Sequence, residues 1–444
     1  MRRTPTPPVL ASVCILFPAA VIGGLLTSPS PGGDAGGRED PAARPATQPP
    51  DARFSPYAPD PDHLWNRLHQ ALFIREAADG SRSVHTTDPL LYRGGTFLLE
   101  GEPHRRAVAL LDRLVDAPGD RPNNPLEVLY FQRDLWAAFD YVAWYPDDWV
   151  FHSRHEPSAV ALRNRLAKLI GGLALGDREI GALPDNYALA VKSNQYPAAH
   201  DPEHPERPFL PADLFDPAGP WVRFHDTTGG PMAREHFDGA GGRAVHVIFL
   251  RLPGGRATTE RYLKELNRDS VKQFPPGTMV AMVRRALAVD RSAKVRVTPV
   301  TELVQIRVYR RIPADPEANS HVDFGEQDVY EFLLDRATLF AGQHGLRAVV
   351  PDDPAEPFFV RSEGANPFEP TRRPLTPMMP QLKTCIHCHR APGVHSVLSM
   401  QRGLRSPDTE VFRFHTWDRE MGYAVKSKVE QFNWGLLQGK LEAR

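Results

Sequence analysis

The chain has 444 residues, of which 41% are hydrophobic, 45 are Pro and only 3 are Cys. With this length and so few cysteines, the chain is not a small protein stabilised by disulfides. At a formal net charge of -1, it lacks the overall positive charge that favours binding to nucleic acid. At about 150 residues per domain, the chain is long enough for two or three folded regions.

The N-terminus has the pattern of an export segment. Arg2 and Arg3 precede an apolar run, Val9–Leu26, and small residues follow it. This pattern predicts an export signal or a membrane anchor over residues 1–26. We therefore expect an exported protein that is periplasmic, or anchored in the membrane and facing the periplasm, which is an oxidising compartment. Residues 27–62 are rich in Pro and Gly and predict a disordered tether.

Residues 63–195 predict a mainly helical region. Apolar side chains recur at helical spacing in four stretches, over residues 63–76, 104–115, 125–144 and 157–175. Pro125 and Pro157 stand at positions where the first turn of a helix tolerates proline.

Residues 196–350 predict a mixed α/β region that begins with a long loop. The loop, as far as residue 242, is rich in Pro, His, Asp and Gly. A helical pattern over residues 258–267 is followed by β-branched, partly alternating residues, which predict at least two strands between residues 278 and 310. The expected fold class is therefore α+β.

Residues 351–444 form the C-terminal segment. Eight prolines between Pro351 and Pro380 exclude a long regular element there, and residues 418–441 predict a closing helix. Because proline breaks this stretch, we expect the C-terminal segment to pack against the preceding region instead of folding alone.

The C-terminal segment contains the one specific motif of the chain, Cys385-x-x-Cys388-His389. Positions i and i+3 share one face of a helical turn, so both sulfurs reach one porphyrin edge while the imidazole at i+4 projects toward the iron. This order of residues is the attachment signature of c-type haem. Cys14 lies in the export segment, so the mature chain keeps only the two cysteines of the motif.

Over these five residues the chain resembles c-type cytochromes. The resemblance implies covalent haem c, with Cys385 and Cys388 as the attachment points and His389 as the proximal iron ligand. It also implies electron transfer. We take Met400 as the distal iron ligand, and several other side chains stay open for that role: Met378, Met379, His395, His415 and Met421.

Other interpretations of the motif stay open. The thiols of Cys385 and Cys388 also suit a disulfide, a reactive redox pair or, with nearby histidines, a zinc site. The matching functions are a peroxidase-like haem-dependent oxidoreductase and a non-haem exported binding protein, so the sequence leaves open whether the chain is an enzyme. Residues 361–444 carry 13 Lys plus Arg against 8 Asp plus Glu, which favours an acidic redox partner protein.

Overall fold

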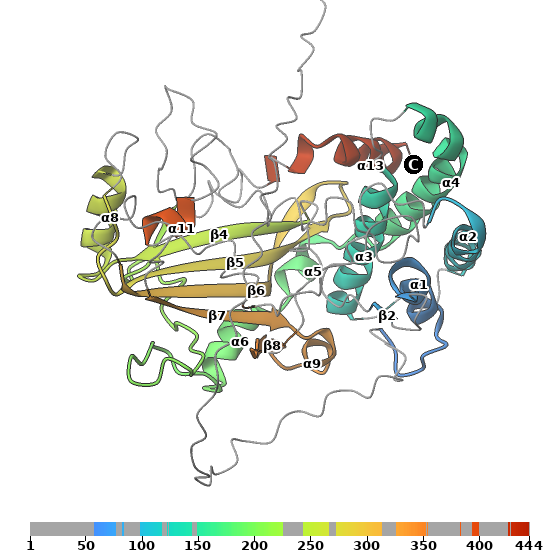
Figure 1. The fold of residues 1–444 in the computed structure, drawn as a ribbon. Coiled ribbons are helices and arrows are strands. Elements are labelled where there is room, and N and C mark those ends of the chain that lie inside the picture. The colour runs from blue at the N-terminus through green and yellow to red at the C-terminus, as the bar shows by residue number, and fades with distance from the viewer. Residues whose placement is uncertain are drawn as a thin grey trace, which may run out of the picture. The chain divides into compact units, whose positions relative to one another are not determined.

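Four helices, at the right in Figure 1, carry the apolar spacing of the N-terminal region. They are α1 (Leu64–Phe73), α2 (Gly101–Asp116), α3 (Pro125–Ala143) and α4 (Trp149–Gly172). The structure is a computed structural model, and it describes residues 57–76, 82–83, 98–117, 122, 124–143, 149–224, 243–265, 272–312, 326–351, 353, 382, 393–398, 425–426 and 428–443. The shorter helices α5 (Asp177–Gly181) and α6 (Asn186–Lys192) follow.

The helix predicted to begin at Pro157 begins at Trp149 instead, with Pro157 inside it. Proline gives up one backbone hydrogen bond within a helix, which is why its position suggested a first turn. Of the two residues just before Pro157, His155 is buried, and Glu156 forms an ion pair with Arg163, about two turns along the same helix.

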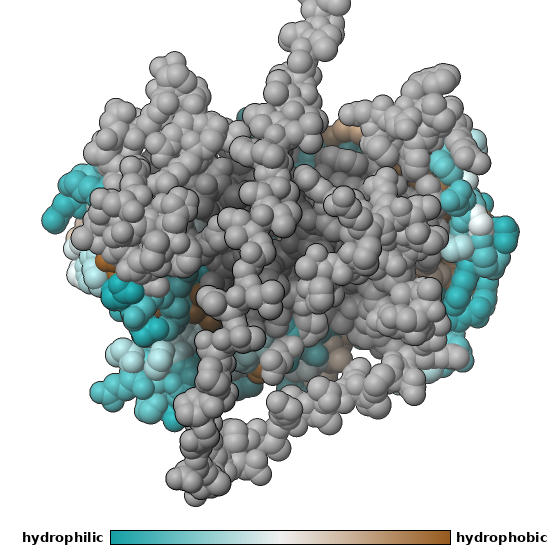
Figure 2. Space-filling view, viewed as in Figure 1, coloured by the Kyte–Doolittle hydropathy of each residue, from teal (hydrophilic) through white to brown (hydrophobic). Residues whose placement is uncertain are grey.

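The amphipathic pattern of α2 determines how this helix packs. Ala107, Leu110, Leu111 and Leu114 are its buried residues, and they recur at the spacing of one helix face. Figure 2 shows hydrophilic side chains over the region where α2 lies in Figure 1. The helix therefore buries one apolar face and exposes the opposite, charged face.

In the part of the chain that the structure describes, six antiparallel strands form the main sheet and pair in chain order. They are β3 (Val222–Phe224), β4 (Ala244–Arg251), β5 (Thr278–Val289), β6 (Val295–Arg311), β7 (Glu326–Leu334) and β8 (Leu346–Ala348). A separate pair joins β1 (Arg75–Glu76) to β2 (Arg82–Ser83). Helix α8 (Arg256–Glu265) follows β4, and α9 (Arg336–Phe340) follows β7. The predicted α+β class is confirmed.

The sheet buries both of its faces. Along β5, Val280 and Met282 belong to one apolar cluster, whereas Ala281 and Val283 belong to another on the opposite face. This division follows from the period of two along a strand. The second cluster includes Tyr187 of α6 and side chains from the segment that follows it, such as Phe209, Leu210, Leu214 and Trp221.

The helices and the sheet share one hydrophobic core. Leu287 and Val289, at the C-terminal end of β5, join the same buried cluster as α1, α2, α3 and α4. The C-terminal helix α13 (Phe432–Glu442) adds Trp434 and Leu437 to it. Folded structure reaches back to Tyr57, inside the stretch predicted as a tether, because the Tyr57 side chain is buried in this core.

Helix α3 is buried on all sides and carries four polar side chains that bind other parts of the chain. Gln132 donates to the backbone carbonyl of Val289 at 2.9 Å and accepts from its N–H at 2.8 Å. Gln132 also donates to the Ile170 carbonyl of α4 at 3.3 Å. A single amide thus joins two helices to the end of a strand, and it supplies hydrogen bonds that buried backbone groups require.

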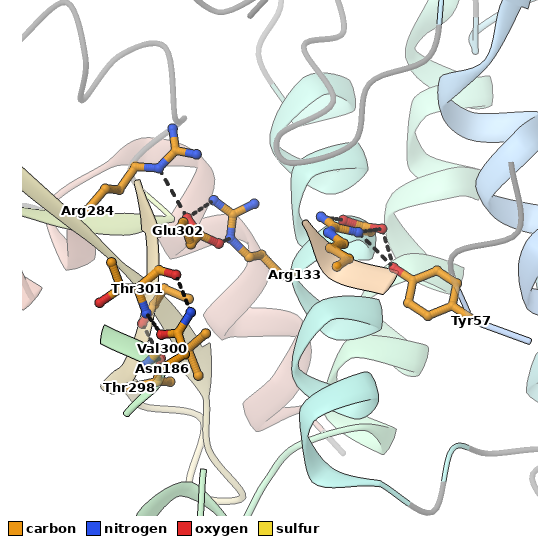
Figure 3. Close-up of polar contacts among 11 residues, drawn as sticks. Tyr57, Arg133, Asn186, Arg284, Thr298, Val300, Thr301 and Glu302 are labelled. Atoms are coloured by element: carbon orange, nitrogen blue, oxygen red, sulfur yellow. Dashed lines mark hydrogen bonds and ion pairs between the residues drawn. The ribbon is translucent and has the colours of Figure 1, made fainter. Parts of the chain in front are cut away.

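The next residue of α3, Arg133, forms a buried ionic cluster with the sheet. Its Nε lies 2.7 Å from Oε1 of Glu302 on β6, and its Nη2 donates to Oε2 at 2.8 Å. Arg284 of β5 approaches the same carboxylate from the other side, at 3.2 Å (Figure 3). All three side chains are almost fully buried, so each charge depends on the others for its stabilisation.

Asp140, two turns along α3, binds the C-terminal part of the chain. Its carboxylate pairs with Arg243 at 2.6 Å and with Lys428 at 3.2 Å, and it accepts a hydrogen bond from Asn433. The Lys428 ammonium also lies 4.8 Å from the centre of the Trp136 ring, a cation–π contact. These contacts attach residues 428–433 to the helical core.

We expect Arg133→Met to destabilise the fold strongly, because it leaves Glu302 buried with only Arg284 beside it. The expected loss is about 1–3 kcal/mol in the free energy of unfolding, the cost of the buried hydrogen-bonded contacts that Glu302 loses, measured by urea denaturation. Arg105→Met is the matched control, since Arg105 pairs with Glu102 on the surface of α2, and we expect no measurable change. Equal stability of the two variants would show that the buried cluster does not join α3 to the sheet.

Candidate functional site

The predicted site residues Cys385, Cys388, His389 and Met400 lie outside the residues that the structure describes. Their roles stay predictions from the sequence. The structure does describe residues on both sides of the motif. Leu382 precedes Cys385 by three positions, and helix α11 (Val394–Leu398) begins five positions after His389.

Both flanks of the motif pack against one face of the main sheet. Val394 is 2% exposed and belongs to the same apolar cluster as Val280 and Met282 of β5. Leu382 and Val397 pack against this cluster too. Figure 1 shows α11 near α8 at one end of the sheet, with α1 to α4 at the other end. The residues that flank the motif therefore pack against the mixed α/β region, as expected from the sequence.

A set of hydrogen bonds, which we call the α11 clasp, holds the start of α11. Ser396 and Tyr309 of β6 share a hydrogen bond of 2.5 Å between their buried hydroxyls. The Val394 N–H donates to Oε1 of Gln273 at 2.8 Å, and the Phe274 N–H donates to the same oxygen at 2.8 Å. The α11 clasp thus fixes both the backbone and a side chain of α11.

Gly393 makes the close approach of the α11 clasp feasible. Its φ is +53°, in the left-handed region that favours glycine. A Cβ atom at this position would overlap the Gln273 side chain and come within 3.1 Å of Ile312. The residue type at 393 is therefore matched to the contact between this segment and the sheet.

Aromatic rings line the sheet beside the α11 clasp. Tyr309 and Phe274 have ring centroids 5.5 Å apart, and Phe274 and Tyr262 of α8 are 5.6 Å apart. Burial raises the pKa of the Tyr309 phenol above its usual value, so this hydroxyl is protonated at neutral pH. A protonated phenol is able to donate its hydrogen bond to Ser396.

The residue types of the motif are those that a covalent haem requires. Covalent haem needs two thiols and an imidazole, which the motif contains, and an apolar surface against which the macrocycle packs. The cluster beside the flanks supplies apolar side chains from β4, β5 and β6, together with the thioether of Met282.

A second group of side chains, of types that occur in active sites, lies in the helical core. The sequence analysis did not identify this group. Asp134 of α3 accepts hydrogen bonds from both amino groups of Arg336, each at 2.8 Å. The same carboxylate lies 3.1 Å from Nδ1 of His69 and accepts a hydrogen bond from the Tyr57 hydroxyl. Asp, His, Tyr and Arg side chains in this arrangement are familiar from acid–base sites.

Burial controls the protonation of this group. Burial opposes the charge on Asp134, but Arg336 and the hydrogen bond with His69 hold the pKa of this carboxyl well below its usual range. Burial lowers the pKa of His69, so a neutral imidazole donates its Nδ1 proton to Asp134. Burial also raises the pKa of the Tyr57 phenol far above its usual value, and the Asp134 charge adds to this shift.

The position of this group indicates a structural role. Tyr57, His69, Asp134 and Arg336 are each at most 6% exposed, and a general acid or base must reach its substrate. Their hydrogen bonds join the start of the folded chain, α1, α3 and α9. The sequence signal for them was the polar run Gln132, Arg133 and Asp134 inside a helix whose neighbours are apolar.

Within the described residues, no group of three or more His, Cys, Asp or Glu side chains is arranged to hold a metal ion. No helix in this part of the chain is long and apolar enough to span a bilayer. Comparison with models of protein families, with curated protein sequences and with solved structures gives no match.

We expect the stability of the protein to fall as the pH drops below about 6.5, because the lowered pKa of His69 lets the unfolded chain bind a proton that the folded chain rejects. The slope contributed by one such proton is at most about 1.4 kcal/mol per pH unit. We expect His69→Asn, which keeps a donor for Asp134, to lose this contribution in urea denaturation between about pH 8 and pH 5.

The control is His204→Asn, because His204 lies in an exposed turn. We expect this variant to keep the pH slope of the unsubstituted protein. If the His69→Asn and His204→Asn variants have the same slope, then His69 is not held neutral in the folded state.

Proposed function

We propose that the protein is an exported monohaem c-type cytochrome that transfers electrons through a covalently bound haem. The observation that carries the proposal is the motif Cys385-x-x-Cys388-His389, in a chain whose only other cysteine, Cys14, lies in the predicted export segment. The packing of both motif flanks on one apolar sheet face supports the proposal, because a haem needs such a surface beside its attachment point.

Each residue of the motif has a distinct role in this proposal. The thiols of Cys385 and Cys388 form thioethers with the haem, and the His389 imidazole is the proximal ligand of the iron. Met400 is the proposed distal ligand, and a thioether in that position favours the reduced state and raises the reduction potential. The bound haem supplies reversible one-electron exchange, and the chain supplies its attachment, its ligands and an apolar environment.

The C-terminal segment is also the proposed surface for the redox partner. Residues 361–444 carry a net charge of +5, from 13 basic and 8 acidic residues, whereas the whole chain carries -1. A positive surface near the haem attracts an acidic partner and raises the rate of encounter at low salt. Export to the periplasm, with or without a membrane anchor, fits the chemistry, since haem of this type is attached after export.

We expect protein produced in a host that matures c-type cytochromes to carry haem that survives acid extraction. Its reduced visible spectrum has a sharp α-band if two strong ligands hold the iron. We expect Cys385→Ala and Cys388→Ala each to break one thioether bond, and the double variant to release all of its haem on extraction. The measurement is the visible spectrum before and after extraction.

Cys14→Ala is the matched control, because it removes a thiol outside the motif and we expect it to keep the full haem content. A colourless protein with one zinc ion per chain would overturn the proposal in favour of a zinc clamp. Bound haem with a high-spin ferric spectrum and peroxide turnover would overturn electron transfer in favour of a peroxidase-like enzyme.

A further inference from the structure

The turn before β8 contains a histidine whose two hydrogen bonds determine its protonation state. The backbone N–H of Leu346 donates to Nδ1 of His344 over a distance of 3.0 Å. A backbone N–H is only a donor, so Nδ1 must be the unprotonated nitrogen of a neutral ring. The ring proton is therefore on Nε2, which donates to Oε1 of Gln195 at 2.8 Å. Both contacts together require a neutral His344 imidazole.

Further hydrogen bonds join this turn and β8 to α6 and the segment after it, which lie beside β8 in Figure 1. Asn186, the first residue of α6, donates to the backbone carbonyl of His344 at 3.0 Å. The Tyr196 hydroxyl donates to the Leu346 carbonyl at 3.3 Å and accepts from the Ala348 N–H at 3.1 Å. We call these contacts, together with the two of the His344 ring, the β8 joint.

The β8 joint holds a short strand at the edge of the sheet. Only three residues of β8 pair with β7, and the strand is the last in the sheet order. Leu346 is 1% exposed and shares an apolar cluster with Tyr187 of α6. A strand with so few ladder contacts has little local stability of its own. The position of β8 therefore depends on the contacts of the β8 joint.

Among the described residues, the groups that contact the His344 ring are uncharged. They are the Leu346 N–H, the Gln195 amide and the Tyr196 ring, whose centroid lies 6.5 Å from that of His344. The charged side chains on the adjacent elements have other contacts: Arg347 of β8 pairs with Asp353, Asp185 before α6 pairs with Arg285, Asp335 before α9 accepts from the Thr338 N–H, and Lys192 of α6 is exposed.

Burial lowers the pKa of His344, and no carboxylate in the described surroundings of the ring opposes this shift. The closed joint thus binds a proton less readily than an open chain does. Its stability is complete above about pH 6.5, the ordinary value for histidine, and decreases as the pH falls below it.

We propose that His344 makes the β8 joint a protonation-sensitive contact that opens locally in acid. A proton from solvent on Nδ1 converts the acceptor of the Leu346 N–H into a second donor, and two donors that face each other do not form a hydrogen bond. Opening separates β8 from the segment after α6 and leaves the edge of β7 less protected. The inference does not depend on a bound haem.

His200 offers a matched control in the same covering segment. Its Nε2 lies 3.2 Å from Oδ2 of Asp328 on β7, and Arg310 pairs with the other oxygen of this carboxylate at 3.0 Å. A proton on His200 adds an attraction to Asp328, so acid does not break this contact. His200→Gln removes a titrating imidazole near the sheet edge and leaves the His344 ring in place.

The experiment is hydrogen–deuterium exchange of the full chain, followed by mass spectrometry of a peptide that covers residues 342–350. Exchange is measured at about pH 7.5 and about pH 5.5, on either side of the ordinary titration of histidine, and is corrected for the intrinsic effect of pH. We expect the protection of this peptide to fall several-fold at the lower pH. His344→Gln keeps an acceptor and a donor without titrating, and we expect nearly equal protection at both pH values.

His344→Asn is the second variant, because an asparagine oxygen accepts readily from the N–H two residues along the chain. A fall in protection in the unsubstituted protein and in His200→Gln, but in neither His344 variant, supports the proposal. The proposal is overturned if the unsubstituted protein shows no fall, if both His344 variants show an equal fall, or if His200→Gln abolishes it.

Discussion

The structure depends on the buried charges of helix α3. Arg133, Asp134 and Asp140 lie where water cannot stabilise them, so each requires a partner of opposite charge from another part of the chain. Glu302 of β6, Arg336 of α9 and Arg243 before β4 supply those partners. An arrangement that separated any of these pairs would leave a charge buried alone, and this cost favours one placement of the helices relative to the sheet.

The contacts of α3 hold one end of the sheet against the helices. The residues that flank the motif pack near the other end of the sheet. The C-terminal end of β5 is hydrogen-bonded to Gln132, whereas its N-terminal end lies beside Tyr309 of the α11 clasp. The long strands β5 and β6 thus connect the helical core to the cluster that contains Val394 and contacts Leu382 and Val397. In the proposed function, a rigid sheet gives the haem a defined environment, and apolar surroundings are one means of tuning a haem potential.

The elements of the fold were largely predictable because their signals are local. Helical spacing over residues 125–144 and β-branched residues between 278 and 310 correctly predicted α3, β5 and β6. Pro157 misled the prediction for the start of α4, since proline is usual in a first turn but here lies inside the helix. The partners of Asp134 and Val394 were not predictable, because Arg336 and Gln273 are 202 and 121 positions away from them. The motif was recognisable because its five residues are consecutive, whereas the side chains that contact its flanking residues come from distant strands.

The central claim is that Cys385 and Cys388 carry a haem in the exported protein. The most direct measurement is the mass of the proteolytic peptide that contains both cysteines, isolated from protein matured in a host that attaches c-type haem. Two thioether bonds predict a peptide heavier by the mass of one haem, with no thiol left to react with an alkylating reagent. A peptide with two free thiols, or with the mass of an internal disulfide, would contradict the claim.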